Sequence, residues 1–308
     1  MKFNRDAREI VTGIDEETGL AWHGRVGRLK SNSAAVTVLC SFVPIMNPDK
    51  SRLCLSVIIP AYNEQNTTRL IVDRVLELPN LLEIVFVDDC SKDGTLAIAQ
   101  EIARNEPRLR VIQHDKNRGK TEALKTGFAA SKGEIVIVQD ADLEYNPSEI
   151  PGIIELIIGG EADVVFGSRF QVRKAARVLY FYHYLANKFL TFLSDIFTNL
   201  NLTDVETGYK AFRGSIIRNM VITSSGFGFE IEVTAKISKL RCAIYEVPIS
   251  YYGRTYEEGK KIGTKDGIAA LWYVLYYNVL VSAKRSFRNL GALQAELTEV
   301  MHARSGSN

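Results

Sequence analysis

The sequence lacks an apolar run long enough to cross a membrane. Its longest candidate, Ile268 to Ala283, is 16 residues long and contains Asn278, whereas a membrane-spanning helix needs about 20 apolar residues. The first 30 residues carry charges throughout and contain no apolar core segment, so we expect no secretory signal peptide. These two absences argue against an integral membrane protein.

Cysteine and net charge are also scarce. The four cysteines, at positions 40, 54, 90 and 242, are widely separated and form no CxxC pair, which argues against a zinc site or a disulfide framework and favours a reducing cytosol. The 38 Lys and Arg residues nearly balance the 36 Asp and Glu residues. The resulting net charge of +2 excludes a general polycation, and we expect no nucleic-acid partner.

Two familiar phosphate-binding motifs are missing. No GxGxxG follows the first expected strand, so a dinucleotide-binding site loses its main support. Gly119-Lys120-Thr121 imitates the end of a Walker A loop, but His114 stands where that loop needs glycine. Residues 117–120 either carry basic groups to a helix start, where an anion would bind, or form a solvated turn.

From residue 55 onward, short apolar runs alternate with segments that have apolar residues at helical spacing. The runs are continuous stretches of Val, Ile and Leu, which is typical of parallel strands buried on both faces. The pattern therefore predicts an α/β fold with a mainly parallel sheet flanked by helices. The expected strands cover residues 55–59, 83–87, 109–112, 134–138 and 163–166, and the expected helices cover 66–78, 96–103, 121–130 and 147–158.

Carboxylates follow three of these expected strands, at the edge where open parallel sheets bind ligands. They are Glu64, Asp89 and the pair Asp140 and Asp142. Two like charges 4 Å apart repel by roughly 4 kcal/mol at an effective dielectric constant of about 20, so we expect a cation or hydrogen-bond donors among them. Two carboxylates at this spacing suit Mg²⁺ or Mn²⁺. Helix capping is the alternative for Asp93.

Taken together, these motifs resemble those of the inverting family 2 glycosyltransferases with the GT-A fold. Within that family, they most resemble the branch of dolichol-phosphate mannosyltransferase and the bacterial polyprenyl-phosphate glycosyltransferases. The matching segments are residues 59–64, 87–95, 117–120, 140–144, 167–169, 207–213 and 252–254, with Lys260 and Lys261. The resemblance implies a Rossmann-like, mainly parallel sheet with C-terminal amphipathic helices. We expect an N-terminal extension of unknown role (1–50), a GT-A domain (51–255), a membrane- or partner-facing helical region (256–290) and a tail (291–308).

The resemblance also implies roles for individual residues. The residues that would bind the nucleotide-sugar donor are Pro60, Ala61, Tyr62, Glu64, Asp89, Lys120 and Asp140. A divalent metal, Mg²⁺ or Mn²⁺, would be held by Asp140, Asp142 and Glu144, the last at a position where relatives often have Gln. The acceptor phosphate would meet Arg169, Arg173, Arg177, Arg254, Lys260 and Lys261. The catalytic residues would be Asp142, Arg169 and Glu230.

The implied reaction moves a sugar from a UDP- or GDP-sugar to a polyprenyl phosphate. Such an acceptor is already anionic at neutral pH, so a strong general base is unnecessary, in agreement with the absence of His from the strand-end motifs. If the acceptor were instead a saccharide hydroxyl of a cell-envelope polysaccharide, Glu230 or Glu232 would be the candidate base. A non-catalytic membrane-associated binding protein is a third reading.

Two basic, aromatic stretches favour contact with a membrane surface. Residues 164–194 contain no acidic residue and five Lys or Arg among several Phe and Tyr, and residues 267–283 contain one Trp and three Tyr before Lys284 and Arg285. Such stretches suit helices that lie in the interface of an anionic bilayer. We expect a cytoplasmic protein bound peripherally to the cytoplasmic membrane. Packing on the core, on a second copy or on an integral membrane partner is the alternative.

Overall fold

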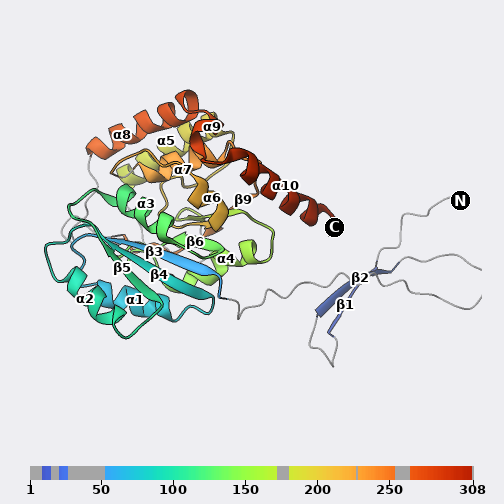
Figure 1. Ribbon diagram of the computed structural model, residues 1–308. Coiled ribbons are helices and arrows are strands. Elements are labelled where there is room, and N and C mark those ends of the chain that lie inside the picture. Colours follow the sequence, from blue (N-terminus) through green and yellow to red (C-terminus); the bar gives the residue numbers. More distant parts are fainter. Residues whose placement is uncertain are drawn as a thin grey trace, which may run out of the picture.

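The computed structural model describes residues 9–14, 21–26, 53–171, 180–226, 228–253 and 264–306 (Figure 1). Its centre is a seven-stranded sheet with the order β5-β4-β3-β6-β8-β7-β9. Strand β8 is antiparallel to β6 and β7, and the other neighbours are parallel, so the predicted mainly parallel sheet is confirmed. The strands are β3 (Leu55–Ala61), β4 (Leu81–Asp88), β5 (Leu109–Gln113), β6 (Ile135–Val138), β7 (Val164–Ser168), β8 (Lys210–Arg213) and β9 (Ile244–Pro248).

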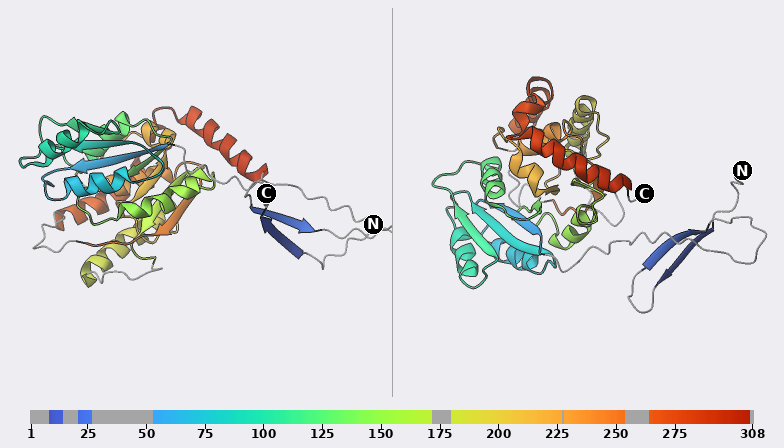
Figure 2. Two further views of the ribbon diagram at one scale, coloured as in Figure 1. Left: turned by 90° about the horizontal axis from the view of Figure 1, so that it is seen from below. Right: turned by 45° about the vertical axis from the view of Figure 1, so that its right-hand side comes forward.

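Helices cover both faces of this sheet, which lies between two helical layers in Figures 1 and 2. One face packs against α1, α2 and α4, and the other against α3, α6, α7 and α10. The helices are α1 (Thr68–Leu76), α2 (Thr95–Ala103), α3 (Lys120–Ala130), η1 (Pro147–Glu149), α4 (Ile150–Ile158), α5 (Phe181–Thr198), α6 (Gly214–Asn219), α7 (Phe229–Ile237), α8 (Thr264–Leu275), the π-helical η2 (Tyr276–Leu280), α9 (Ala283–Ser286) and α10 (Leu290–Gly306).

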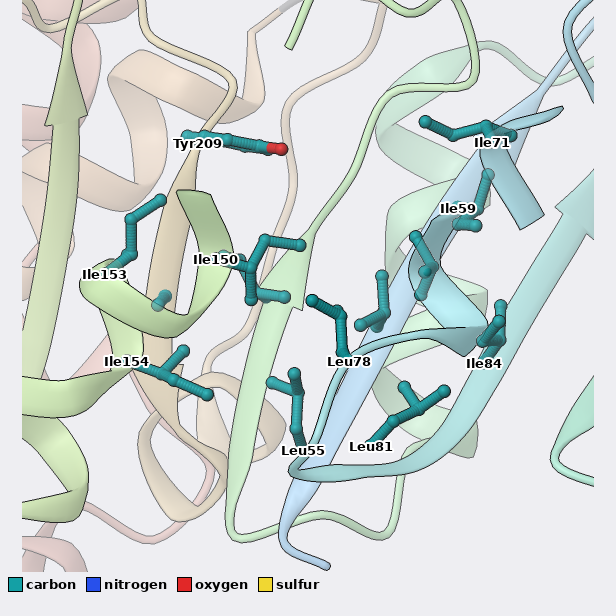
Figure 3. Close-up of a cluster of buried hydrophobic side chains, with 14 of the residues drawn as sticks. Leu55, Ile59, Ile71, Leu78, Leu81, Ile84, Ile150, Ile153, Ile154 and Tyr209 are labelled. Carbon is teal, nitrogen blue, oxygen red and sulfur yellow. The ribbon is translucent and has the colours of Figure 1, made fainter. Parts of the chain in front are cut away.

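Successive residues of one strand supply both halves of the core. In β3, Val57 and Ile59 belong to the cluster on the α1 and α4 face, whereas Ile58 belongs to the opposite cluster. Figure 3 shows the first cluster, with Leu55 of β3 near Ile154 of α4. Each such side chain contributes about 1.5–3 kcal/mol when it is fully buried. This two-sided burial explains why the strands could be located from their apolar runs.

Three helices form a further layer at one end of the molecule. Helices α5, α7 and α8 contact one another and lie together in Figure 1. Ile231 of α7 and Ala270 and Val274 of α8 form a small buried cluster with Val205. Among the described residues, none of the helices combines the length and the apolar character that crossing a membrane requires.

The structure adds secondary structure to the segments that the sequence left undefined near both ends. Strands β1 (Glu9–Ile14) and β2 (Ala21–Val26) pair antiparallel inside the expected extension. Most of the expected tail, 291–308, is helical, because α10 buries Leu293 and Leu297 at helical spacing. Near its end, the guanidinium of Arg304 lies 2.7 Å from the carboxylate of Asp163. The expected tail is therefore helical as far as Gly306 and packs on the rest of the molecule through Leu293, Leu297 and Arg304.

Gly127 allows α3 to lie close against the sheet. A Cβ atom at this position would overlap with Cγ2 of Ile58. We expect Gly127→Ala to lower the free energy of unfolding by about 1–3 kcal/mol, because overpacking outweighs the helix propensity of alanine. Gly152→Ala in α4 is the matched control, since its Cβ would meet nothing within 4 Å, and it should raise the stability by up to about 1 kcal/mol. Denaturant unfolding measures both, and equal effects would contradict this packing.

Candidate functional site

A cleft of about 380 Å³ opens at the carboxyl edge of the parallel strands. Because β6 is central in the sheet, β3 and β4 end on one side of it, and β8 begins and β7 and β9 end on the other. Eleven residues singled out from the sequence line this cleft: Pro60, Ala61, Tyr62, Glu64, Asp89, Lys120, Asp140, Asp142, Glu144, Arg169 and Glu230. Five residues expected at the acceptor phosphate, Arg173, Arg177, Arg254, Lys260 and Lys261, lie outside the described residues.

Hydrogen bonds join the loops that follow β3 and β4. Asn63 adopts a left-handed conformation, with φ of 55°, and its Oδ1 accepts from the backbone N–H of Lys92 at 2.8 Å. The N–H of Glu64 donates to Oγ1 of Thr95 at 2.8 Å. Oδ1 of Asp93 accepts from the N–H of Thr95, the first residue of α2, at 3.0 Å, although the N-cap residue of this helix is Gly94. These contacts fix the wall of the cleft that contains Pro60–Glu64.

Asp89 holds the loop that begins α3. Its Oδ1 lies 2.7 Å from Nδ1 of His114 and accepts from the N–H of Arg118 at 2.9 Å. Its Oδ2 accepts from the N–H of Gly119 at 2.7 Å. Gly119 has φ of 88°, a conformation that favours glycine. The buried carboxylate therefore positions Lys120, the first residue of the helix.

Lys120 bridges two carboxylates that come from different elements, one just after β6 and one in α7. Its Nζ lies 3.0 Å from Oδ1 of Asp140 and 3.2 Å from Oε1 of Glu230. Burial alone would lower the pKa of Lys120, but the two carboxylates outweigh it and raise that pKa well above the usual range. The ammonium is thus charged at neutral pH and relieves the repulsion expected at this edge.

The acidic turn after β6 is tightly shaped. Leu143 has φ of 62°, and the N–H of Glu144 donates to Oδ1 of Asp142 at 3.1 Å. The hydroxyl of Tyr251 donates to Oε2 of Glu144 at 2.8 Å. Within the described parts of the chain, no three carboxylate, imidazole or thiol side chains gather as a metal-binding group. A metal here would need ligands from a bound molecule.

Gly208 is required by the close approach of Asp140. A Cβ atom at this position would lie 2.7 Å from Oδ2 of Asp140 and 3.1 Å from the ring of Tyr145. The Gly208 N–H donates to the hydroxyl of Tyr145 at 3.0 Å, and that ring stacks on Tyr209 with centroids 4.6 Å apart. The floor of the cleft is therefore built from backbone and aromatic rings.

Arg169 forms a buried ion pair on the β7 side of the cleft. Its Nε and Nη2 donate to Asp204 at 2.6 and 2.7 Å, and its guanidinium lies 5.1 Å from the ring centroid of Tyr251. Burial alone would raise the pKa of Asp204, but Arg169 outweighs it and lowers that pKa. Arg169 is thus charged and held in place, with its side chain 13% exposed.

Sequence reasoning missed Glu206, Tyr145 and Tyr251, which also line the cleft. Burial, together with the nearby Glu230, raises the pKa of Glu206 to about 7. The only signal for Glu206 was its place just before the matching segment 207–213. Glu232, the second candidate base, is wrong for that role, because its carboxylate is buried against Lys236 and accepts from the Ser224 N–H at 2.7 Å.

Comparisons with known proteins agree with this geometry. The Glycosyl transferase family 2 profile matches residues 56–221. An undecaprenyl-phosphate mannosyltransferase from Micrococcus luteus is 31% identical over 235 residues, 70% of this chain and 94% of that protein. A polyprenol monophosphomannose synthase from Mycolicibacterium smegmatis is 30% identical over 215 residues, 68% of this chain and 81% of that protein.

Among solved structures, a glucosyl-3-phosphoglycerate synthase from Mycobacterium tuberculosis, in complex with Mn²⁺, UDP and glucosyl-3-phosphoglycerate, has a similar fold. Its TM-score is 0.60 at 20% identity, over 81% of this chain and 88% of that one. The fold is thus that of the GT-A glycosyltransferases, as the sequence predicted. The chain belongs to glycosyl transferase family 2, and the predicted glycosyltransferase is confirmed.

The Arg169–Asp204 pair gives a testable pH dependence. We expect Asp204→Asn to lower the free energy of unfolding by about 3 kcal/mol at pH 7, because it leaves a buried guanidinium uncompensated. The lowered pKa of Asp204 stabilises the fold above the unfolded pKa of about 4, and this contribution is lost as the pH falls through the folded value. The difference in the free energy of unfolding between the wild type and Asp204→Asn should therefore become smaller below about pH 4.

Denaturant unfolding between pH 7 and pH 3 measures this deficit. The control is Glu101→Gln, which breaks the exposed pair of Glu101 with Arg69 and should cost less than about 1 kcal/mol. A deficit as small as the control, or one that does not change with pH, would contradict the buried pair.

Proposed function

We propose that this enzyme transfers a sugar from a UDP- or GDP-sugar to a polyprenyl phosphate, with inversion at the anomeric carbon. The observation that supports it best is the order of groups along the cleft. The loops after β3 and β4 line one side, Asp140 and Asp142 the middle, and Arg169 the other side. The relatives from Micrococcus luteus and Mycolicibacterium smegmatis are named as an undecaprenyl-phosphate mannosyltransferase and a polyprenol monophosphomannose synthase, which agrees with the proposed reaction.

The donor half would use residues 60–64 for the nucleoside and the middle of the cleft for its diphosphate. Asp140 and Asp142 offer hard oxygen ligands on one turn, which fit Mg²⁺ or Mn²⁺ when phosphates and water complete the shell. Such an ion, when bound, would neutralise the leaving diphosphate. The neighbour from Mycobacterium tuberculosis was solved with Mn²⁺ and UDP. Lys120 would add a second positive charge at the same place.

The transfer itself mainly requires that the donor and the acceptor phosphate are held in the correct relative position. A phosphate oxygen of the acceptor attacks the anomeric carbon as the bond to the diphosphate oxygen breaks, and the nucleoside diphosphate leaves with that electron pair. Arg169 would orient the acceptor phosphate, since a guanidinium matches phosphate oxygens in pairs. Asp204 and Tyr251 hold that guanidinium before the acceptor arrives, which reduces the ordering that binding requires.

The acceptor end of the cleft adjoins an exposed apolar surface. Phe170 follows Arg169 directly, and its ring contacts Tyr184 of α5 at a centroid distance of 5.2 Å. We define the aromatic surface as the exposed apolar residues of α5, α8 and η2, namely Phe181, Tyr182, Tyr184, Leu185, Phe189, Phe192, Ile196, Phe197, Trp272, Leu275, Tyr276, Val279 and Leu280. Helix α5 contacts both α8 and η2, and α5 and α8 lie together in Figure 1.

The polarity of α5 is inverted relative to an ordinary surface helix. Its buried residues are Thr191, Ser194 and Thr198, while Phe189 and Phe192 are 54% and 63% exposed. Lys284, Arg285 and Arg288 are exposed after η2. Aromatic side chains beside basic ones suit the interface of an anionic bilayer. We therefore propose that the aromatic surface lies on the membrane, with the described part of the region 256–290 contributing through α8 and η2.

The metal assignment can be tested through Asp142. We expect Asp142→Ala to lower turnover at least about a hundredfold, because the leaving diphosphate loses its counter-charge. The same substitution should abolish the metal dependence of nucleoside diphosphate binding in calorimetry. Asp73→Ala, on the exposed face of α1, is the control and should match the wild type. If Asp142→Ala kept the turnover of the wild type, the assignment of Asp142 as a metal ligand would be contradicted.

The membrane assignment can be tested by sedimentation with anionic vesicles. We expect Phe192→Ser combined with Trp272→Ser to weaken vesicle binding about tenfold or more, since each buried aromatic contributes about 1.5–3 kcal/mol. Leu70→Ser is the control, because Leu70 is 43% exposed on α1 and lies outside the aromatic surface. Unchanged vesicle binding in the double variant would contradict the assignment. So would a dimer in light scattering that only the double variant disrupts.

A further inference from the structure

The backbone on either side of Glu206 is held by contacts that do not involve its carboxyl group. Nζ of Lys210 donates to the carbonyl oxygens of Val205 and Thr207 at 2.9 and 2.5 Å. Asp204 is fixed by Arg169, and Gly208 donates to the Tyr145 hydroxyl. The loop thus keeps its shape without the Glu206 carboxyl, and that group is available for another task.

The carboxyl group of Glu206 lines the cleft and has an unused oxygen. Its Oε1 is buried and has no hydrogen-bond partner among the residues that the structure describes. Buried polar atoms in native proteins nearly always have a partner, so an exception needs an explanation. Burial raises the pKa of Glu206 to about 7, and a carboxyl group can accept hydrogen bonds in either protonation state. A bound molecule with donor groups would satisfy this oxygen.

The order of the strands indicates which part of a bound substrate would reach the carboxyl group of Glu206. Glu206 precedes β8, and β8 lies between β6, which Asp140 follows, and β7, which ends next to Arg169. Since Glu206, Asp140 and Arg169 line one cleft, this order favours a position for the carboxyl between the place for the leaving diphosphate and the place for the acceptor phosphate. Fully ionised phosphates offer no donor and repel a carboxylate, whereas the sugar that must lie between them presents several hydroxyl donors.

We propose that Glu206 is a specificity-determining residue that accepts hydrogen bonds from the hydroxyl groups of the transferred sugar, an inference that rests on the proposed function. It distinguishes a nucleotide sugar from the bare nucleoside diphosphate. Pairing with sugar hydroxyls also explains why the carboxyl needs no partner in the protein.

Calorimetry with matched pairs of ligands, UDP with UDP-glucose and GDP with GDP-mannose in Mn²⁺, tests this role. In Glu206→Ala we expect the affinity for the preferred nucleotide sugar to fall about tenfold, because hydrogen bonds to a carboxylate are lost. The affinity for the nucleoside diphosphate should stay within about twofold of wild type. Glu206→Gln, which keeps one acceptor oxygen, should lie between the two, and Glu155→Ala on the exposed face of α4 should match wild type. In turnover, the donor KM should rise and the acceptor KM should not.

Four results would overturn the proposal. Equal losses for nucleoside diphosphate and nucleotide sugar would mean that Glu206 only shapes the cleft. An increase confined to the acceptor KM would place the carboxyl against the acceptor. Wild-type protein that binds no nucleotide sugar would refute the proposed function and this role together. Wild-type protein that transfers sugar while Glu206→Ala and Glu206→Gln bind the donor normally would refute this role alone.

Discussion

The site depends on neutralising the negative charge that several strands bring to one edge of the sheet. Asp140 and Glu230 share the ammonium of Lys120, and Asp204 is paired with Arg169. Asp89 takes backbone amides and His114 instead. Because these four carboxylates are compensated by cations or by amide and imidazole donors, they can line one cleft without the repulsion that like charges at this distance would cause.

The packing of the fold also sets where these compensating charges lie in the cleft. Lys120 begins α3, and α3 can approach the sheet only because Gly127 has no side chain. Gly208 likewise lets the backbone pass close to Asp140. The cations that hold the free cleft together are also those that a diphosphate and a lipid phosphate would meet. Small residues far apart in the sequence thus set the distances on which the proposed transfer depends.

Much of the fold was predictable because the parallel strands are buried on both faces and leave continuous apolar runs. The acidic edge was predictable because parallel strands end on the same side. Glu206, by contrast, lies in a loop, where no periodicity marks a side chain that faces a cleft. The pairing of Arg169 with Asp204 spans 35 residues and depends on β7 and β8 being neighbours, which spacing does not reveal. Most of α10 fell inside the expected tail because Leu293 and Leu297, which the structure buries, give only a short apolar pattern in the sequence.

The central claim is that a sugar passes from a nucleotide to a lipid phosphate in this cleft. Its most direct test incubates the wild-type protein with labelled UDP- and GDP-sugars, Mg²⁺ or Mn²⁺, and vesicles that contain a polyprenyl phosphate. We expect label in the organic phase only when metal and polyprenyl phosphate are both present, and a lipid product heavier by one sugar residue in mass spectrometry. Label that remains in the aqueous phase, or that moves to a soluble saccharide without the lipid, would contradict the account.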